Sequence, residues 1–436
     1  MNEYFHSVNL DKDKCRGCTN CIKKCPTEAI RVRKGKARII KERCIDCGEC
    51  IRVCPYHAKT AISDSLELIN NYKYKVAIPA PSFYGQFDKK YTRDNILNAL
   101  KEVGFDHVFE VAGAAEIVTE ATRQLLANPE VSKPMISSAC PGVVRLIQVR
   151  FPSLIDKIVK LESPMEVAAK IVKTQLRTTS IADEDIGVFF ISPCPAKVTS
   201  VKSPYEKQKS YVDGVISMKD IYVKVLSRLS SPSNQSNYSK AGFQGMDWAN
   251  SGGESGALGT DKVLAVDGIH NVIKLFDQLE SDRLTDVDFV EALSCSGGCL
   301  GGPLTVTDRF VAKTTLRKHI SEAPICYTGI TDLKSSEELV WTSNVEYKPV
   351  MKLDQDISRA MEKLEMLENI YSGLPGLDCG ACGAPNCRAL AEDIVRETAN
   401  ETDCIFKLRQ RILDLAEEMV ELGGKVPPVM ERDTGS

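Results

Sequence analysis

Residues 291–303 read EALSCSGGCLGGP, a short strand-forming run that leads into two cysteines set among glycines. Two other strand-like runs lead into cysteines in the same way, at 134–138 before Cys140 and at 188–192 before Cys194. Four thiolates on such loops are enough to hold one iron-sulfur cubane. Because α/β folds place their sites on loops beyond strand ends, the pattern predicts an α/β fold with a metal centre.

The bulk composition narrows the class of protein. The chain has 436 residues and a formal net charge of −3, which offers no argument for nucleic acid or an anionic membrane as a partner. No apolar run reaches the roughly 18 residues of a transmembrane helix, and residues 1–10 lack the pattern of a signal peptide. We therefore expect a cytoplasmic protein that binds neither nucleic acid nor membrane. In that compartment, 17 cysteines indicate metal ligation rather than disulfides.

A repeated cysteine motif opens the chain. Two C-x2-C-x2-C-x3-C-P runs contain Cys15, Cys18, Cys21 and Cys25, and then Cys44, Cys47, Cys50 and Cys54. This spacing is typical of bacterial ferredoxins with two 4Fe-4S clusters, in which the fourth cysteine of each run ligates the other cluster. A pair of zinc sites is the alternative, although zinc motifs rarely show this spacing. Residues 1–62 are therefore predicted to form a two-cluster ferredoxin-like α+β domain. Its basic side chains would either offset the anionic clusters or form a docking face for an acidic electron carrier, and they are only weak evidence for nucleic acid.

A third cysteine group lies near the end of the chain. It has the spacing C-x2-C-x4-C-x16-C and consists of Cys379, Cys382, Cys387 and Cys404. It resembles the small four-cysteine 4Fe-4S domain of several redox proteins from anaerobes, with zinc as the alternative. We expect this small helical domain at 376–405, preceded by a linker helix within 346–375. The remaining cysteine, Cys326, is expected to be a buried thiol.

Residues 406–436 are predicted to form an amphipathic helix and a tail. Apolar residues recur at alternating steps of three and four: Ile405, Leu408, Ile412, Leu415, Met419 and Leu422. Such a stripe is heptad-like. It predicts packing against the same chain, a homodimer seam, or a docking helix for a signalling partner, and its length does not discriminate among them.

The loops at Cys140, Cys194 and the Cys295/Cys299 pair resemble the three signature loops of the catalytic domain of iron-iron (FeFe) hydrogenases. The resemblance covers about residues 74–305, and we expect that domain within 70–345. It implies an H-cluster, a 4Fe-4S cubane joined to a two-iron unit with carbonyl and cyanide ligands. It also implies reversible conversion of dihydrogen to protons and electrons, and hydrogenase maturation proteins as partners.

The resemblance also implies residue roles. Cys140, Cys194 and Cys295 would hold the cubane, and Cys299 would bridge it to the two-iron unit. Lys197 would donate a hydrogen bond to a cyanide. Residues beside these ligands would line the cofactor, with glycines letting the backbone approach a bulky inorganic group: Ser138, Pro141, Pro193, Pro195, Gly298 and Gly301.

The sequence departs from the family at its proton route. The family carries a proton-relaying cysteine at the position of Ala139, which cannot hold a proton. Of two relay glutamates, one aligns with Glu120 and the outer one with Arg123, while the relay serine aligns with Val159. Further departures at family positions are Val143, Met165, Ser192 and Leu293. The ligands are kept while the usual proton route is lost.

This combination resembles the sensory branch of the family, in particular the group called D, which lacks a PAS domain. It predicts slow oxidation of dihydrogen at the H-cluster, with electrons relayed through three further 4Fe-4S clusters to a redox carrier such as ferredoxin. One alternative is an ordinary ferredoxin-linked hydrogenase with a different proton path. Another is a non-enzymatic protein of electron transfer or cluster assembly. No strand-GxGxxG-helix motif points to a nicotinamide cofactor.

Overall fold

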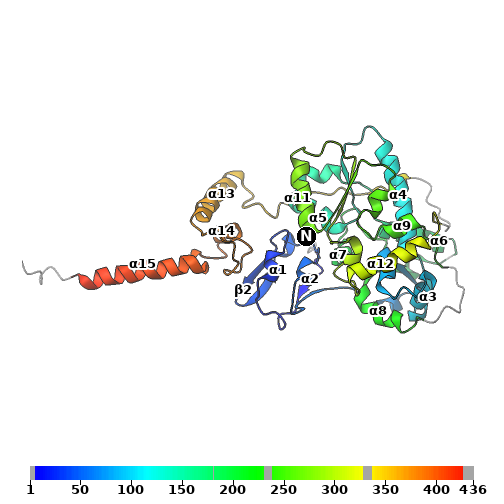
Figure 1. Cartoon of the computed structure of the whole chain (residues 1–436), viewed down its shortest axis with the longest axis horizontal. Helices are drawn as coiled ribbons and strands as arrows, with labels where there is room; N and C mark the ends of the chain where they lie inside the picture. Colours follow the sequence, from blue (N-terminus) through cyan, green and yellow to red (C-terminus); the bar gives the residue numbers. More distant parts are fainter. Residues whose placement is uncertain (1–4, 180, 230–237, 328–335, 426–436) are drawn as a thin grey trace, which may run out of the picture. The chain divides into compact units, whose positions relative to one another are not determined.

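The computed structural model describes residues 5–179, 181–229, 238–327 and 336–425 (Figure 1). The chain divides into two compact units, which we call the larger unit and the smaller unit. The larger unit comprises Met1–Lys14 and Lys41–Val350, and the smaller unit comprises Cys15–Ile40 and Met351–Ser436. The first ferredoxin-type motif therefore falls in the smaller unit, with the C-terminal cysteines, and the second motif falls in the larger unit.

Two parallel sheets form the core of the larger unit. The four-stranded sheet has the order β6 (His107–Val108), β5 (Tyr74–Pro79), β8 (Ile186–Ser192) and β9 (Gly214–Ser217). The three-stranded sheet has the order β10 (Val263–Asp267), β11 (Phe289–Leu293) and β7 (Met135–Ile136). Every residue of β8 and β11 is buried, as expected for strands covered on both faces. The predicted α/β fold is confirmed.

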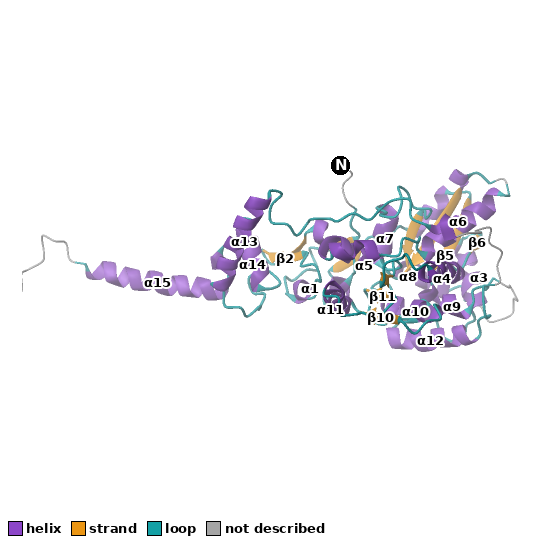
Figure 2. Ribbon diagram, turned by 90° about the horizontal axis from the view of Figure 1, so that it is seen from above, coloured by secondary structure: helices purple, strands orange, loops and turns teal. Residues whose placement is uncertain are grey.

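Helices surround these strands (Figure 2). They are α3 (Arg93–Val103), α4 (Val111–Ala127), α5 (Pro141–Arg150), α6 (Pro164–Arg177), α7 (Pro195–Lys202), α8 (Met218–Leu226), α9 (Phe243–Asp247), α10 (Gly253–Ala257), α11 (Ile269–Glu280) and α12 (Arg309–Ser321). Helix α4 packs against both α6 and α9. Residues 230–260, rich in Ser, Gly and Asn, would be expected to form a loop, yet they contain α9 and α10; residues 230–237 lie outside the described residues.

The second ferredoxin-type motif is joined to the larger unit by buried hydrogen bonds. Strand β1 (Val8–Leu10) pairs antiparallel with β4 (Lys59–Ala61), and the short helix α2 (Glu49–Arg52) lies within the motif. Asp46, between two ligand cysteines, accepts a 2.7 Å hydrogen bond from the Thr199 hydroxyl on α7. The motif is thereby fixed to the helix that follows Cys194.

The smaller unit joins the first ferredoxin-type motif to the C-terminal cysteines. It contains α1 (Asn20–Lys23), the antiparallel pair β2 (Ile30–Arg33) and β3 (Lys36–Ile39), α13 (Ile357–Ser372), α14 (Cys387–Val395) and α15 (Ile405–Gly424). The buried carboxylate of Asp393 on α14 accepts hydrogen bonds of 2.7 Å from both Arg31 and Arg33. The backbone N–H of Val32 donates to the Gly383 carbonyl at 2.8 Å. The β2–β3 hairpin is therefore clamped to the C-terminal segment.

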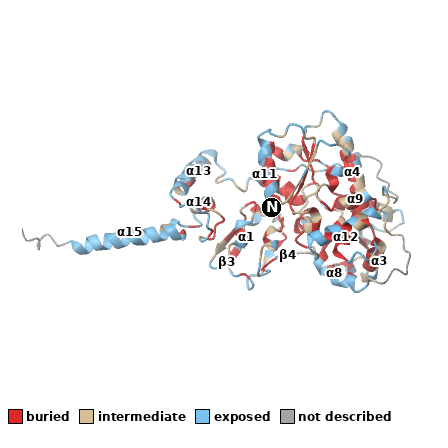
Figure 3. Cartoon of the chain, in the orientation of Figure 1, coloured by how far each residue is buried: buried red, intermediate tan, exposed pale blue. Residues whose placement is uncertain are grey.

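Two features of the C-terminal half bear on the sequence predictions. Helix α15 buries none of its side chains against the described residues, so the part of the chain that the structure describes does not support the first of the three interpretations of its stripe (Figure 3). Cys326 is exposed, whereas a buried thiol was expected. The tail at 426–436 lies outside the described residues.

Candidate iron-sulfur active site

Three strands of the larger unit lead to cysteines that were predicted to be ligands. Strand β7 leads to Cys140, β8 to Cys194 and β11 to Cys295. Cys140 and Cys194 are the N-caps of α5 and α7, each followed by a proline that is compatible with the first helical turn. The first N–H groups of a helix have no partner within it, so these positions favour an anionic ligand.

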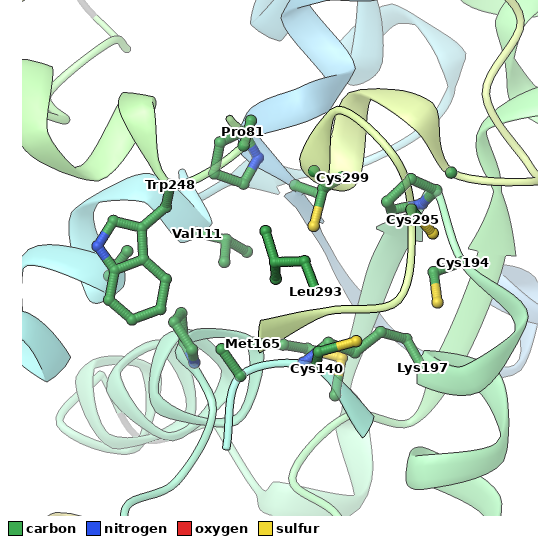
Figure 4. Close-up of a pocket in the computed structure, with 18 of the residues that line it drawn as sticks. Pro81, Val111, Cys140, Met165, Cys194, Lys197, Trp248, Leu293, Cys295 and Cys299 are labelled. Carbon is green, nitrogen blue, oxygen red and sulfur yellow. The ribbon is translucent and has the colours of Figure 1, made fainter. Parts of the chain in front are cut away.

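The four cysteines of the three loops line one cavity of about 90 Å³ (Figure 4). Most of its remaining wall is apolar, and this wall includes Pro81, Val111, Met165, Trp248 and Leu293. The Ser294 hydroxyl lies 3.2 Å from the Cys140 sulfur. The structure thus brings together Cys140, Cys194, Cys295 and Cys299 as the sequence predicts.

The donors suit an iron-sulfur cofactor. Burial raises the pKa of the Cys299 thiol to about 12 and also raises the pKa values of Cys194 and Cys295. Free thiolates are unfavourable at such buried positions, and binding of a metal is the way in which these sulfurs would lose their protons. Lys197 lines the same cavity, and its positive charge acts to lower the pKa of Cys299. Four sulfurs and one cation fit an anionic cluster.

The other predicted lining residues differ in their placement. Pro141 and Pro193 line the cavity along with Gly298. Ser138 instead directs its hydroxyl to the Leu161 carbonyl, and the Pro195 carbonyl accepts a hydrogen bond from Ser7.

Close packing inside the protein gives the glycines of this loop a further reason to lack a side chain. Gly298 has a φ of +72°, and a Cβ there would lie 2.6 Å from the Ala249 carbonyl oxygen. A Cβ on Gly301 would lie 2.1 Å from the Ser296 carbonyl oxygen. Both glycines are therefore required by close backbone packing around the loop.

The structure places the three residues on which the predicted loss of the usual proton route rests: Ala139, Glu120 and Val159. Ala139 lines the cavity and offers only a methyl group. Glu120, predicted to be catalytic, is instead an exposed residue of α4 that pairs with Arg123 at 2.9 Å and is not among the residues that line the cavity. Val159 is buried in the apolar core. Glu120 therefore lies outside this cavity with an exposed carboxylate, and its catalytic role stays a prediction.

An acidic pair that the sequence analysis did not identify also lines the cavity. Burial, together with the negative charge of Glu291, raises the pKa of Glu254 to about 8, and burial also raises the pKa of Glu291. The Ser137 hydroxyl donates to Glu254 at 2.6 Å and accepts from the Ala139 N–H at 3.2 Å. Glu291 lies in the buried strand quoted first, where an acid is uncommon. That was the only sequence signal for this pair.

The second ferredoxin-type motif reaches the ligand loops directly. The Arg52 guanidinium donates to the Gly301 carbonyl and hydrogen-bonds the Cys295 sulfur. A Cβ on Gly48, within the motif, would lie 2.4 Å from the Pro303 ring. One side chain therefore connects this motif to a ligand of the active-site cavity.

Cysteines gathered at the ends of parallel strands, beside a ferredoxin-type motif, define an iron-sulfur redox protein. The chain belongs to the family described as iron only hydrogenase large subunit, C-terminal domain, whose profile matches residues 73–228 and 232–303, more than half of the chain. A 4Fe-4S dicluster domain matches residues 7–55, and an Fe-S cluster domain matches 374–406. These matches support iron-sulfur clusters at the three cysteine groups.

Individual relatives cover parts of the chain. The periplasmic [Fe] hydrogenase large subunit of Nitratidesulfovibrio vulgaris is 29% identical over 213 residues, 44% of this chain and 51% of that protein. The cytosolic Fe-S cluster assembly factor NAR1 of Saccharomyces cerevisiae is 26% identical over 149 residues, 32% of this chain and 30% of that protein. The chain thus spans about half the length or less of these relatives.

A solved structure was also found to be similar. A variant of the [FeFe]-hydrogenase HydA1 from Chlamydomonas reinhardtii aligns with a TM-score of 0.49 and 17% identity, covering 64% of this chain and 95% of that chain.

Within the described residues, none of the helices combines the length and the apolar character that a membrane span needs.

Proposed function

We propose that this protein is a sensory FeFe hydrogenase that binds dihydrogen and oxidises it slowly and reversibly at an H-cluster. One observation carries this proposal. The four cysteines, Lys197 and the inert side chain of Ala139 all line the same cavity. Retained ligands allow the cofactor to bind, whereas a missing general acid or base typically costs about 10²–10⁴-fold in rate. A sensor needs a redox response to dihydrogen and does not need fast turnover.

Each residue of the cavity has a role in this proposal. The H-cluster, when bound, supplies the chemistry that splits dihydrogen. Cys140, Cys194, Cys295 and Cys299 would hold it through their sulfurs. Lys197 would donate a hydrogen bond to one of its anionic ligands. The apolar wall excludes water.

Glu254 is the proton carrier that we assign in place of the usual route. With a pKa of about 8, its carboxyl group can both take up and release a proton near neutral pH. Its hydrogen bond to Ser137 holds it beside Ala139, the position at which the family has its relay cysteine. This carrier also supports the alternative of an ordinary hydrogenase with a different proton path, which high turnover of the wild-type protein would favour.

Three further 4Fe-4S clusters relay electrons in this proposal. The second motif would hold the cluster next to the H-cluster in this relay, because Arg52 of that motif hydrogen-bonds the Cys295 sulfur. Within the smaller unit, a Cβ on Gly380 would lie 3.6 Å from the Ile22 side chain. Gly380 lies between Cys379 and Cys382, and Ile22 follows Cys21, so two ligand loops touch. The C-terminal cluster is therefore next to the cluster of the first motif in the relay.

The partners follow from this relay. We assign a redox carrier such as ferredoxin, a separate signalling partner, hydrogenase maturation proteins for the two-iron unit, and a cytoplasmic location. Cell fractionation tests the location, since one relative is named as periplasmic.

The second candidate function is a non-enzymatic protein of electron transfer or cluster assembly, which the similarity to NAR1 favours. Infrared spectra of the anaerobically matured protein, recorded with and without dihydrogen, decide between the two. Carbonyl and cyanide bands that shift with the gas, together with slow turnover, support the sensory hydrogenase. Absence of these bands after proper maturation overturns it. Iron analysis gives a second readout, about 18 irons per chain with the two-iron unit and about 16 without it.

A further inference from the structure

Helix α15 presents a continuous apolar stripe to solvent. Its six stripe residues are between 41% and 73% exposed: Ile405, Leu408, Ile412, Leu415, Met419 and Leu422. The helix has 20 residues, so the stripe is about 30 Å long. Leaving this much aliphatic surface in water is unfavourable, which indicates that the stripe is covered by a partner.

The stripe has the order of a coiled-coil seam. With Ile405 assigned to position a, the a positions hold Ile405, Ile412 and Met419, and the d positions hold Leu408, Leu415 and Leu422. Apolar residues at every a and d position form the seam along which two helices pair.

The charges of α15 decide which partner fits. Residues 407–411 contain three cations (Lys407, Arg409 and Arg411) and no acid. Residues 414–421 contain four carboxylates (Asp414, Glu417, Glu418 and Glu421) and no cation. A parallel pair of such helices would align cations with cations and carboxylates with carboxylates. An antiparallel pair places the basic half of each helix against the acidic half of the other.

We infer that α15 pairs antiparallel with α15 of a second copy of this chain, through its aliphatic stripe and through reciprocal Arg411–Glu418 ion pairs. One two-fold axis between residues 413 and 414 satisfies both sets of contacts. It pairs every a residue with a d residue of the second copy: Ile405 with Leu422, Leu408 with Met419, and Ile412 with Leu415. Arg411 and Glu418 both occupy g positions, which face each other in antiparallel coiled coils.

Arg411 and Glu418 are available for this contact. Neither forms an ion pair with any other residue in the described part of the chain. Cys404, the last ligand of the C-terminal cluster, is the N-cap of α15. Antiparallel pairing therefore places the two Cys404 residues at opposite ends of the seam. The proposed contacts involve none of the cluster ligands, so the pairing does not depend on the function proposed above.

A charge-exchange cycle on the full-length, cluster-loaded protein tests the inference by sedimentation equilibrium. The wild type is expected to dimerise. Arg411→Glu and Glu418→Arg should each weaken the dimer about tenfold, because each places like charges at two sites. The double variant carrying both changes should recover the wild-type affinity. In a parallel pair Arg411 would not face Glu418, so the cycle would show no recovery.

A second variant tests the apolar stripe independently of the charge pairs. Leu415→Asp at the centre of the stripe should abolish the dimer while leaving the iron content and helical signal unchanged, because α15 is exposed in the single chain. A protein that is monomeric at its highest soluble concentration overturns the inference. So does a dimer insensitive to Leu415→Asp, or a larger assembly that also uses Phe406, Leu413 and Val420 and ignores the charge cycle.

Discussion

Replacing Glu254 by glutamine tests the assigned proton carrier most directly. The amide keeps the shape of the side chain and can still accept the 2.6 Å hydrogen bond from Ser137, but it cannot release a proton at neutral pH. A pKa of about 8 leaves the wild-type carboxyl about 90% protonated at pH 7 and about 10% protonated at pH 9. Dihydrogen evolution that uses Glu254 as an acid should therefore fall about tenfold across this interval.

The variant Glu254→Gln should lose this inflection, and its turnover should fall by about 10²–10⁴-fold. The assay is dihydrogen evolution and uptake with a dye between pH 6 and pH 9, on protein whose infrared bands match those of the wild type. Glu254→Asp keeps an ionisable group, so it should retain an inflection at a reduced rate. Glu291→Gln removes a neighbouring negative charge, so it should move the inflection to lower pH.

The reasoning is refuted if Glu254→Gln, with its infrared bands intact, keeps both the wild-type turnover and the wild-type pH profile. In that case the proton would travel by a route that does not include this carboxyl group. A loss of bands in the variant would instead report failed cofactor binding, and Glu254→Asp would then decide the question.

Three further predictions concern other parts of the molecule. Ala139→Cys alone should not restore the activity of a fast hydrogenase, measured as dihydrogen evolution, because the outer relay positions remain lost. Arg52→Gln should lower the reduction potential of the cubane by roughly 30–60 mV in a redox titration, because a cation that stabilises the reduced cluster is removed. Lys262→Gln, which removes an exposed cation paired with Asp286, should leave this potential unchanged. Asp393→Ala leaves Arg31 buried without its carboxylate, so the smaller unit should lose about 3–5 kcal/mol of stability, seen as faster proteolysis of the C-terminal segment; equal proteolysis rates would contradict the clamp.

The positions of the ligands were predictable from the sequence because short-range patterns encode them. The apolar run before Cys194 predicts a buried strand, and the structure has β8 ending directly before the Pro193–Cys194 pair. The cysteine spacing within the three loops, together with Lys197, was sufficient to predict that residues far apart in the chain line one cavity. The helical stripe from Ile405 to Leu422 was likewise visible as a periodicity.

Tertiary structure decided the properties that depend on which distant segments pack together. Glu120 faces solvent while Glu254 is buried against Ser137, although both are glutamates on helices, and burial beside Glu291 alone gives Glu254 its raised pKa. Gly298 is required by the Ala249 carbonyl, a backbone neighbour that lies far from it in the chain. The sequence by itself predicted which cysteines meet at the cavity and which strands lead to them, because local spacing and periodicity encode both. Only the fold decided where a proton can reside and which apolar face stays uncovered, because both depend on long-range burial.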